Sequence, residues 1–358
     1  MAISEEKSKA MWLQIAVTYG YVTLWIGLSS TVIMYNKWLL SFSGFPYPVA
    51  LTLWHMVFCS FLATVIVKLG YVEPIGMSRE TYLRAIVPIG FLYAGTLWLG
   101  NAAYLYLSVS FIQMLKALMP VAVFGVGCIF GTEAYSPATL ANMLVVSLGV
   151  AIASWGEINF VLVGVALQML SIATESTRLT LVQILLQRRG LKLNPITTLY
   201  YLAPACAAFL LVPFALIEAP KMLADAELVI APAIMISNAA AAFGLNMAVF
   251  LLIGKTSALT MNIGGVVKDW LLIALSWALF HSPVTAVNLG GYALAFAAVC
   301  WYNVQKLNAM RAAAEKTAPS SESTDEELAS LMKDGKTRSP SVKRPAGTSA
   351  EHKRSPST

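Results

Sequence analysis

Two lysines draw attention because each lies deep in an apolar stretch long enough to cross a membrane. Lys268 stands beside Asp269 in the segment Gly254–Trp277, and Lys116 lies about two turns into SVSFIQMLKALMPVAV. A charge at the centre of a membrane helix costs at least about 2.5 kcal/mol on insertion scales. Two lysines facing one cavity would repel each other, and a phosphate or diphosphate would satisfy both. The pattern therefore indicates a site for a phosphorylated ligand.

Other interpretations of the charged residues stay open. Lys116 could snorkel to the nearer membrane surface, and Lys268 could pair with an acid on another helix. Neighbouring helix residues diverge by about 100°, so we expect Asp269 to face away from Lys268 and to pair elsewhere or cap a cavity wall. Glu175 and Arg178 lie on one helical face and can form an internal ion pair that acts as a gate or as a scaffold.

Several polar and aromatic side chains inside the apolar stretches are further candidates for substrate contacts. Asparagine amides could bind a sugar or a base, or could hold helices together. Tyrosine rings could stack on a base or simply pack. The candidates are Asn101, Tyr104, Tyr200, Tyr201 and Asn262.

The sequence offers no motif for catalysis or for a cofactor. Zinc, P-loop, Rossmann and G-x-S-x-G patterns are missing, and the four cysteines share no metal-ligand spacing. We therefore expect no enzyme activity, no catalytic residue, no metal and no cofactor. Much of the net charge of +6 lies in the C-terminal tail and in loops on one side. In a membrane protein this distribution is a signal of topology rather than of nucleic-acid binding.

The composition is that of an integral membrane protein. The chain has 358 residues, of which 58% are hydrophobic and 12% charged, whereas a soluble domain carries about 25% charged residues. About ten apolar stretches are each long enough to cross roughly 30 Å of hydrocarbon. They are Leu13–Met34, Val49–Leu69, Ala85–Leu107, Ser110–Phe130, Ala138–Trp155, Phe160–Gln187, Pro195–Ile217, Leu228–Ile253, Thr256–Phe280 and Ala286–Val304.

The loops predict the orientation. With the N-terminus in the cytosol, the cytosolic loops hold most lysines and arginines, and the opposite loops hold mainly acids. An even number of spans then places both termini in the cytosol. The predicted domains are a cytosolic N-terminus (1–12), a first repeat (13–155), a second repeat (156–304) and a disordered cytosolic tail (305–358). The tail is rich in Ser, Pro, Lys, Arg and Glu, which is typical of disorder.

Lys116 and Lys268 occupy matching places in two halves of the chain. Each lies in the fourth of five spans, and each of these spans follows its predecessor after a short break. Five is odd, so two five-span halves must insert with opposite orientation, as in transporters that bind substrate at the repeat interface. We therefore expect an all-α membrane protein with about ten helices in two inverted five-helix repeats.

At these residues the sequence resembles a known family. The strings YNKWLL, YLSVSFIQMLKALMPVAV, LKLNPITTLYYLAP and GKTSALTMNIGGVVKDWLLIALSW are similar to those of the nucleotide-sugar transporter / triose-phosphate translocator family, in the drug/metabolite transporter superfamily. The similar green-plant clade holds probable sugar phosphate/phosphate translocators and Golgi UDP-arabinofuranose transporters. The resemblance implies alternating access, with Lys116 and Lys268 holding phosphate. Plastid members place an arginine where this chain has Asp269, which disfavours small phosphorylated sugars.

The leading hypothesis from the sequence is a Golgi antiporter that imports a UDP-sugar, with UDP-arabinofuranose as the candidate, and exports UMP. The alternative is a sugar-phosphate/phosphate exchanger of a non-plastid membrane. The location is expected to be outside the plastid because the N-terminus lacks the character of a transit peptide. A membrane-embedded glycosyl- or acyltransferase and a scaffold acting through the tail are two further hypotheses. The expected partners are the substrate pair and membrane lipid, without nucleic acid; the oligomeric state is not indicated.

Overall fold

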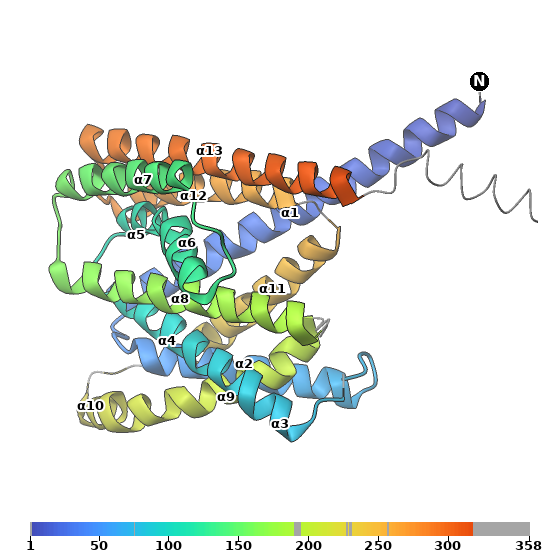
Figure 1. Ribbon diagram of the computed structural model, residues 1–358. Helices are drawn as coiled ribbons and strands as arrows, with labels where there is room; N and C mark the ends of the chain where they lie inside the picture. Colours follow the sequence, from blue (N-terminus) through green and yellow to red (C-terminus); the bar gives the residue numbers. More distant parts are fainter. Residues whose placement is uncertain are drawn as a thin grey trace, which may run out of the picture. The chain divides into compact units, whose positions relative to one another are not determined.

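The described part of the chain is built of helices alone, which confirms the all-α prediction (Figure 1). The computed structural model describes residues 2–74, 76–189, 195–226, 228, 231–255 and 258–317. The helices are α1 (Ala2–Phe42), α2 (Pro48–Lys68), α3 (Arg79–Thr81), η1 (Tyr82–Ile86), α4 (Val87–Ala103), α5 (Val109–Lys116), α6 (Met119–Phe130), α7 (Pro137–Trp155), α8 (Leu162–Arg189), α9 (Pro195–Pro213), η2 (Phe214–Glu218), α10 (Ala219–Ala224), α11 (Pro232–Lys255), α12 (Ala258–Phe280) and α13 (Ala286–Thr317).

The outside of the bundle is apolar, as contact with lipid requires. Large side chains such as Ile129, Leu216 and Leu162 are 81%, 74% and 70% exposed, far beyond what a soluble monomer tolerates in such numbers. Among the described residues, six helical stretches have the length and hydropathy to cross a membrane. They are Pro48–Lys68, Arg79–Ala103, Val109–Phe130, Pro137–Trp155, Ile196–Ala224 and Pro232–Val249. The protein is therefore a multi-pass membrane protein.

Two helices extend beyond the predicted spans. α1 begins at Ala2 and ends at Phe42, whereas the prediction was Leu13–Met34. α13 continues to Thr317, so the predicted disordered tail is wrong for its first residues, from Gln305. The physical reason is the local sequence QKLNAMRAAAEKT, which is rich in strong helix formers and needs no apolar face to remain helical as the continuation of an existing helix.

The contacts between helices repeat with an offset of five spans. α1 packs on α11, which is a contact between the first and the eighth predicted spans. α4 packs on α8, which is a contact between the third and the sixth. α2 packs on α9 and α5 on α12, the second span on the seventh and the fourth on the ninth. If each span of the first half is exchanged with its counterpart five places later, the same set of contacts is obtained: the contact of spans one and eight becomes that of spans six and three, and the other two pairs are unchanged. This is the pattern that two five-helix repeats produce; the repeat boundaries at 155 and 156 stay predictions.

α7 and α13, the last helix of each predicted repeat, meet backbone to backbone (Figure 1). A Cβ atom at Gly291 would lie 2.3 Å from the nitrogen of Ala153, and one at Gly149 would lie 2.5 Å from the nitrogen of Ala295. Only glycine allows so close an approach. The two helices therefore approach to backbone contact at Gly149 and Gly291, and we call this contact the seam.

Candidate functional site

Lys116 is the last residue of a short helix that ends because of a proline. α5 begins after Ser108, whose hydroxyl accepts a hydrogen bond from the backbone nitrogen of Phe111 at 3.1 Å. Pro120 lies in the first turn of α6, and its ring is incompatible with a helical carbonyl four residues earlier, at Lys116. The span is therefore broken at Ala117 and Leu118, and the Lys116 side chain starts from a helix C-terminus, where a cation is favoured.

Lys268 lies on α12 between an acid and an aromatic ring. Its Nζ atom is 3.5 Å from Oδ1 of Asp269 and 5.5 Å from the centroid of the Trp25 ring on α1. Gly264 permits this approach of α1, because a Cβ there would lie 3.2 Å from the Trp25 ring. The expectation that Asp269 turns away from Lys268 is wrong. The two Cα–Cβ bonds diverge, but the four-carbon stem of lysine is long enough to curve back to its neighbour.

The structure brings both lysines into one electrostatic neighbourhood. α5, which ends at Lys116, packs against α12, which carries Lys268 and Asp269. The two ammonium groups therefore repel each other, and the Asp269 carboxylate attracts both. Glu175 on α8 also attracts Lys116. Together with Arg178 these residues form what we call the charged cluster, and it is assembled from α5, α8 and α12. The side chains of the charged cluster are far apart in the sequence, and the folded helices bring them together.

Glu175 and Arg178 form the ion pair that their spacing predicts. The Arg178 Nε and Nη2 atoms lie 2.8 and 2.5 Å from the two carboxylate oxygens, a bidentate arrangement. The guanidinium carbon lies 4.8 Å from the centroid of the Tyr93 ring on α4. Both side chains are about one-fifth exposed. The pair is thus held from two sides, by its own helix and by α4.

Asn101 takes part in a chain of buried hydrogen bonds. Its Nδ2 donates to the Thr52 hydroxyl at 3.0 Å, and its Oδ1 accepts from Asn36 at 3.3 Å. Asn36 in turn accepts from Asn238 at 3.0 Å, and Asn238 contacts His55 through a hydrogen bond. The chain links α1, α2, α4 and α11. Both ends of the Asn101 amide are occupied, so in this structure it holds helices together.

Lys37, three residues beyond the predicted first span, is buried and only 8% exposed. Its ammonium group donates to the carbonyl oxygens of Tyr104 and Leu107 at 2.6 and 3.0 Å. These carbonyls follow the end of α4, where backbone acceptors have no partner within their own helix. The carbonyl of Tyr104 also accepts from Ser41 at 2.8 Å. Tyr104 itself is a buried core residue, 5% exposed.

Tyr200 and Tyr201 pack near the start of α9. Their rings meet edge to face with centroids 5.0 Å apart, and the Tyr201 ring lies 6.3 Å from that of Tyr82. The Tyr82 hydroxyl donates to the Tyr201 carbonyl at 3.3 Å. Asn262 belongs to α12, but its side chain lies outside the described residues.

Glu218 is a residue that the sequence analysis missed. It ends η2, yet its carboxylate accepts hydrogen bonds from the backbone nitrogens of Val49 and Ala50 at 3.0 and 2.7 Å. These are free N–H groups of the first turn of α2, whose own N-cap residue, Tyr47, provides no side-chain cap. Tyr47 instead donates to Asp225 at 2.8 Å. No local sequence signal could have found Glu218, because the helix it caps lies far away in the chain.

These contacts lie at one end of the bundle, which we call the capped end. It holds the end of α4 with Lys37, the start of α2 with Glu218, and the end of α7. There Asn288 donates to the Ala153 carbonyl at 2.6 Å and Thr285 to the Gly156 carbonyl at 3.0 Å. Each of these helix ends is satisfied by a side chain from another helix. Side-chain hydrogen bonds therefore hold these helix ends together at the capped end.

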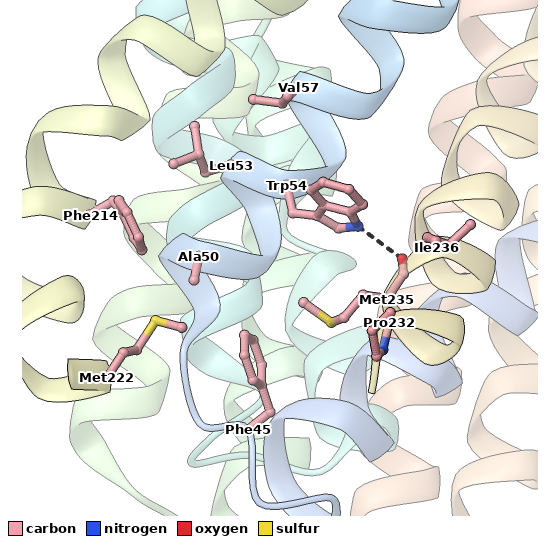
Figure 2. A pocket seen from close by; sticks show the side chains of 10 residues that line it. All are labelled: Phe45, Ala50, Leu53, Trp54, Val57, Phe214, Met222, Pro232, Met235 and Ile236. Carbon is pink, nitrogen blue, oxygen red and sulfur yellow. Dashed lines mark hydrogen bonds between the residues drawn. The ribbon is translucent and has the colours of Figure 1, made fainter. Parts of the chain in front are cut away.

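An apolar pocket of about 430 Å³ lies between α2, η2, α10 and α11 (Figure 2). Figure 2 shows Phe45, Phe214 and Met222 around it, with Trp54 donating a hydrogen bond to the Met235 carbonyl at 2.9 Å. Its lining carries no charged residue. Because a phosphate needs cationic or N–H partners, this pocket is not the phosphate site, and the charged cluster is the better candidate.

A multi-pass helical bundle with lysines and carboxylates held inside it is the architecture of a secondary transporter. The sequence profile of the Triose-phosphate Transporter family matches residues 16–303, and the chain belongs to this family. Two relatives from Arabidopsis thaliana, each named a probable sugar phosphate/phosphate translocator, are 52% and 51% identical to it, each covering 91% of this chain and 94% of the relative. UDP-galactose transporter 1 of Arabidopsis thaliana is 28% identical, over 78% of this chain and 84% of the relative.

Proposed function

We propose that the protein exchanges a sugar phosphate for inorganic phosphate across a membrane, with Lys116 and Lys268 holding the phosphate group. The observation that carries this proposal is the packing of α5, which ends at Lys116, against α12, which carries Lys268. A phosphate supplies the negative charge that both need, and lysine holds it as a point charge that can release it again. The names of the two sugar phosphate/phosphate translocators reported above favour this alternative over the UDP-arabinofuranose hypothesis.

Transport proceeds by alternating access around the charged cluster. The capped end is the closed gate of one face, because Lys37, Glu218 and Asn288 each bridge helices there. With the N-terminus in the cytosol, as the loop charges predict, the end of α1 and hence the capped end face the lumen. Protease protection of tags at the two termini in sealed vesicles tests this orientation.

The decisive experiment is exchange in proteoliposomes. Vesicles loaded with inorganic phosphate should take up labelled triose or hexose phosphate. Lys116→Ala and Lys268→Ala should each lower the rate about 30- to 160-fold, since each removes a phosphate contact of about 2–3 kcal/mol. Lys68→Ala, at the exposed end of α2, is the matched control. Wild-type protein that exchanges no phosphorylated compound would refute the proposal.

The second candidate is exchange of a UDP-sugar, with UDP-arabinofuranose as the first to test, for UMP in the Golgi membrane. The relation to a UDP-galactose transporter favours it, as does the acid Asp269 within the charged cluster. Asn101, Tyr104, Tyr200, Tyr201 and Asn262 stay candidates for base or sugar contacts in that case. Loading the same vesicles with UMP in place of phosphate distinguishes the two: uptake that depends on UMP alone supports the second candidate.

A further inference from the structure

The charged cluster contains two ion pairs of different quality. Glu175 and Arg178 form two hydrogen bonds of 2.8 and 2.5 Å, in the range of a strong bidentate pair. Lys268 and Asp269 are 3.5 Å apart, longer than a charge-assisted hydrogen bond, which is about 2.7–2.9 Å. The first pair is a fixed part of the scaffold. The second is loose, so another anion can displace one partner from the other.

Asp269 also serves more than one cation. α5, whose last residue is Lys116, packs against α12, which carries Asp269. The Asp269 carboxylate therefore attracts Lys116 as well as Lys268, which is 3.5 Å away on its own helix. A phosphate bound between the two lysines would make the same two interactions. Asp269 and a phosphate therefore compete for the same two lysines. The carboxylate is covalently attached to α12, so it is always present to neutralise them when no phosphate is bound.

The charges explain what this competition achieves. Without Asp269 the cluster would hold three cations, Lys116, Lys268 and Arg178, against the single carboxylate of Glu175. Enclosing such an excess of positive charge between closed gates is costly, because there is no water or ligand to stabilise it. A carrier of that kind changes sides only when loaded, which makes exchange obligatory. With Asp269 the empty cluster is nearer to neutrality.

We propose that Asp269 is an internal anion that takes the place of the substrate phosphate between Lys116 and Lys268, so that the empty carrier can change sides. This inference rests on the proposed function, in which the two lysines bind phosphate. Asp269 is then a positioning residue that sets the balance between one-way transport and exchange. It also weakens phosphate binding, because the ligand must first displace it.

The test compares two rates from proteoliposomes loaded with labelled inorganic phosphate, or with labelled UMP if only UMP supports exchange. Efflux into buffer that contains the same unlabelled anion measures exchange, and efflux into buffer without it measures one-way transport. Asp269→Asn should lower the ratio of one-way transport to exchange at least about tenfold and lower the KM for the external anion, a change near 1.4 kcal/mol per tenfold. Asp269→Glu should keep the wild-type ratio.

Matched variants separate the possible results. Glu73→Gln, in the exposed loop before α3, should change neither rate. If Asp269→Asn does not fold, Asp269→Ser removes the same charge and carries the same expectation. An unchanged ratio and KM in the charge-removing variant, with exchange present in wild type, would overturn this inference alone. Absence of exchange for either anion in wild type would overturn the proposed function instead.

Discussion

Glu218→Gln is predicted to loosen the start of α2 without unfolding the rest of the bundle. The Glu218 carboxylate accepts two hydrogen bonds, from Val49 and Ala50 at 3.0 and 2.7 Å, in a place where it is 6% exposed. Glutamine keeps one oxygen but loses the charge and turns an NH₂ group toward a backbone N–H. The loss of one bond to a charged acceptor and the weakening of the other cost about 2–4 kcal/mol. That corresponds to a factor of about 30 to 1,000 in local opening.

Hydrogen exchange measured by mass spectrometry reads this opening directly. The peptide that covers Tyr47–Leu51 should exchange about 30 to 1,000 times faster in Glu218→Gln. Glu157→Gln is the control, because Glu157 is a glutamate at the same end that is 8% exposed and whose Oε1 has no hydrogen-bond partner. Unchanged exchange of this peptide in Glu218→Gln would refute the capping role, however the variant behaves in transport.

Three further predictions concern stability, measured as thermal unfolding in detergent. Lys37→Met leaves the buried carbonyls of Tyr104 and Leu107 without their donor, so the unfolding temperature should fall by several degrees for a loss of about 1–3 kcal/mol; a fall no larger than for exposed Lys68→Met would contradict this. Gly291→Ala should cost about 3 kcal/mol or more, since its methyl group would meet backbone at 2.3 Å, whereas Gly290→Ala meets nothing within 4 Å and should be tolerated. Equal effects of the two would count against the seam. Burial raises the pKa of the Glu157 carboxyl in the folded state. Above this folded-state pKa the buried carboxylate lowers the free energy of unfolding, and the loss disappears once the pH falls below the pKa of the unfolded state. Glu157→Gln should therefore stabilise the protein at pH 7 and lose this advantage near pH 4, and a constant difference across that range would argue against the desolvation.

Local spacing was a good guide to some of the charged residues. Glu175 and Arg178 are three residues apart on one helix, and the periodicity of the helix alone brings them together. The break after Lys116 follows from Pro120 by the same kind of local reasoning. The apolar stretches predicted the all-helical membrane fold for a similar reason, since only the length and hydropathy of each segment are needed.

Local reasoning failed where a flexible side chain or a distant helix decides the contact. Asp269 was expected to turn away from Lys268, because helical geometry fixes the direction of the Cβ atom but not the path of a long lysine stem. Glu218 and Lys37 cap helices that are far away in the chain, and only the folded structure shows which helix end each one meets. Substrate identity lies beyond local reasoning for a related reason: the positions of Lys116 and Lys268 indicate a phosphate and say nothing of what is attached to it.

In the alternating-access cycle proposed above, the capped end links transport to water. While this end is closed, the N–H groups of Val49 and Ala50 and the carbonyls of Tyr104 and Leu107 bind side chains of other helices. When the helices separate, these groups need new partners, and water is the one that is always at hand. Opening this face therefore takes up water at defined backbone positions. An osmolyte that lowers water activity should hold the carrier closed at the capped end, even if it never enters the protein.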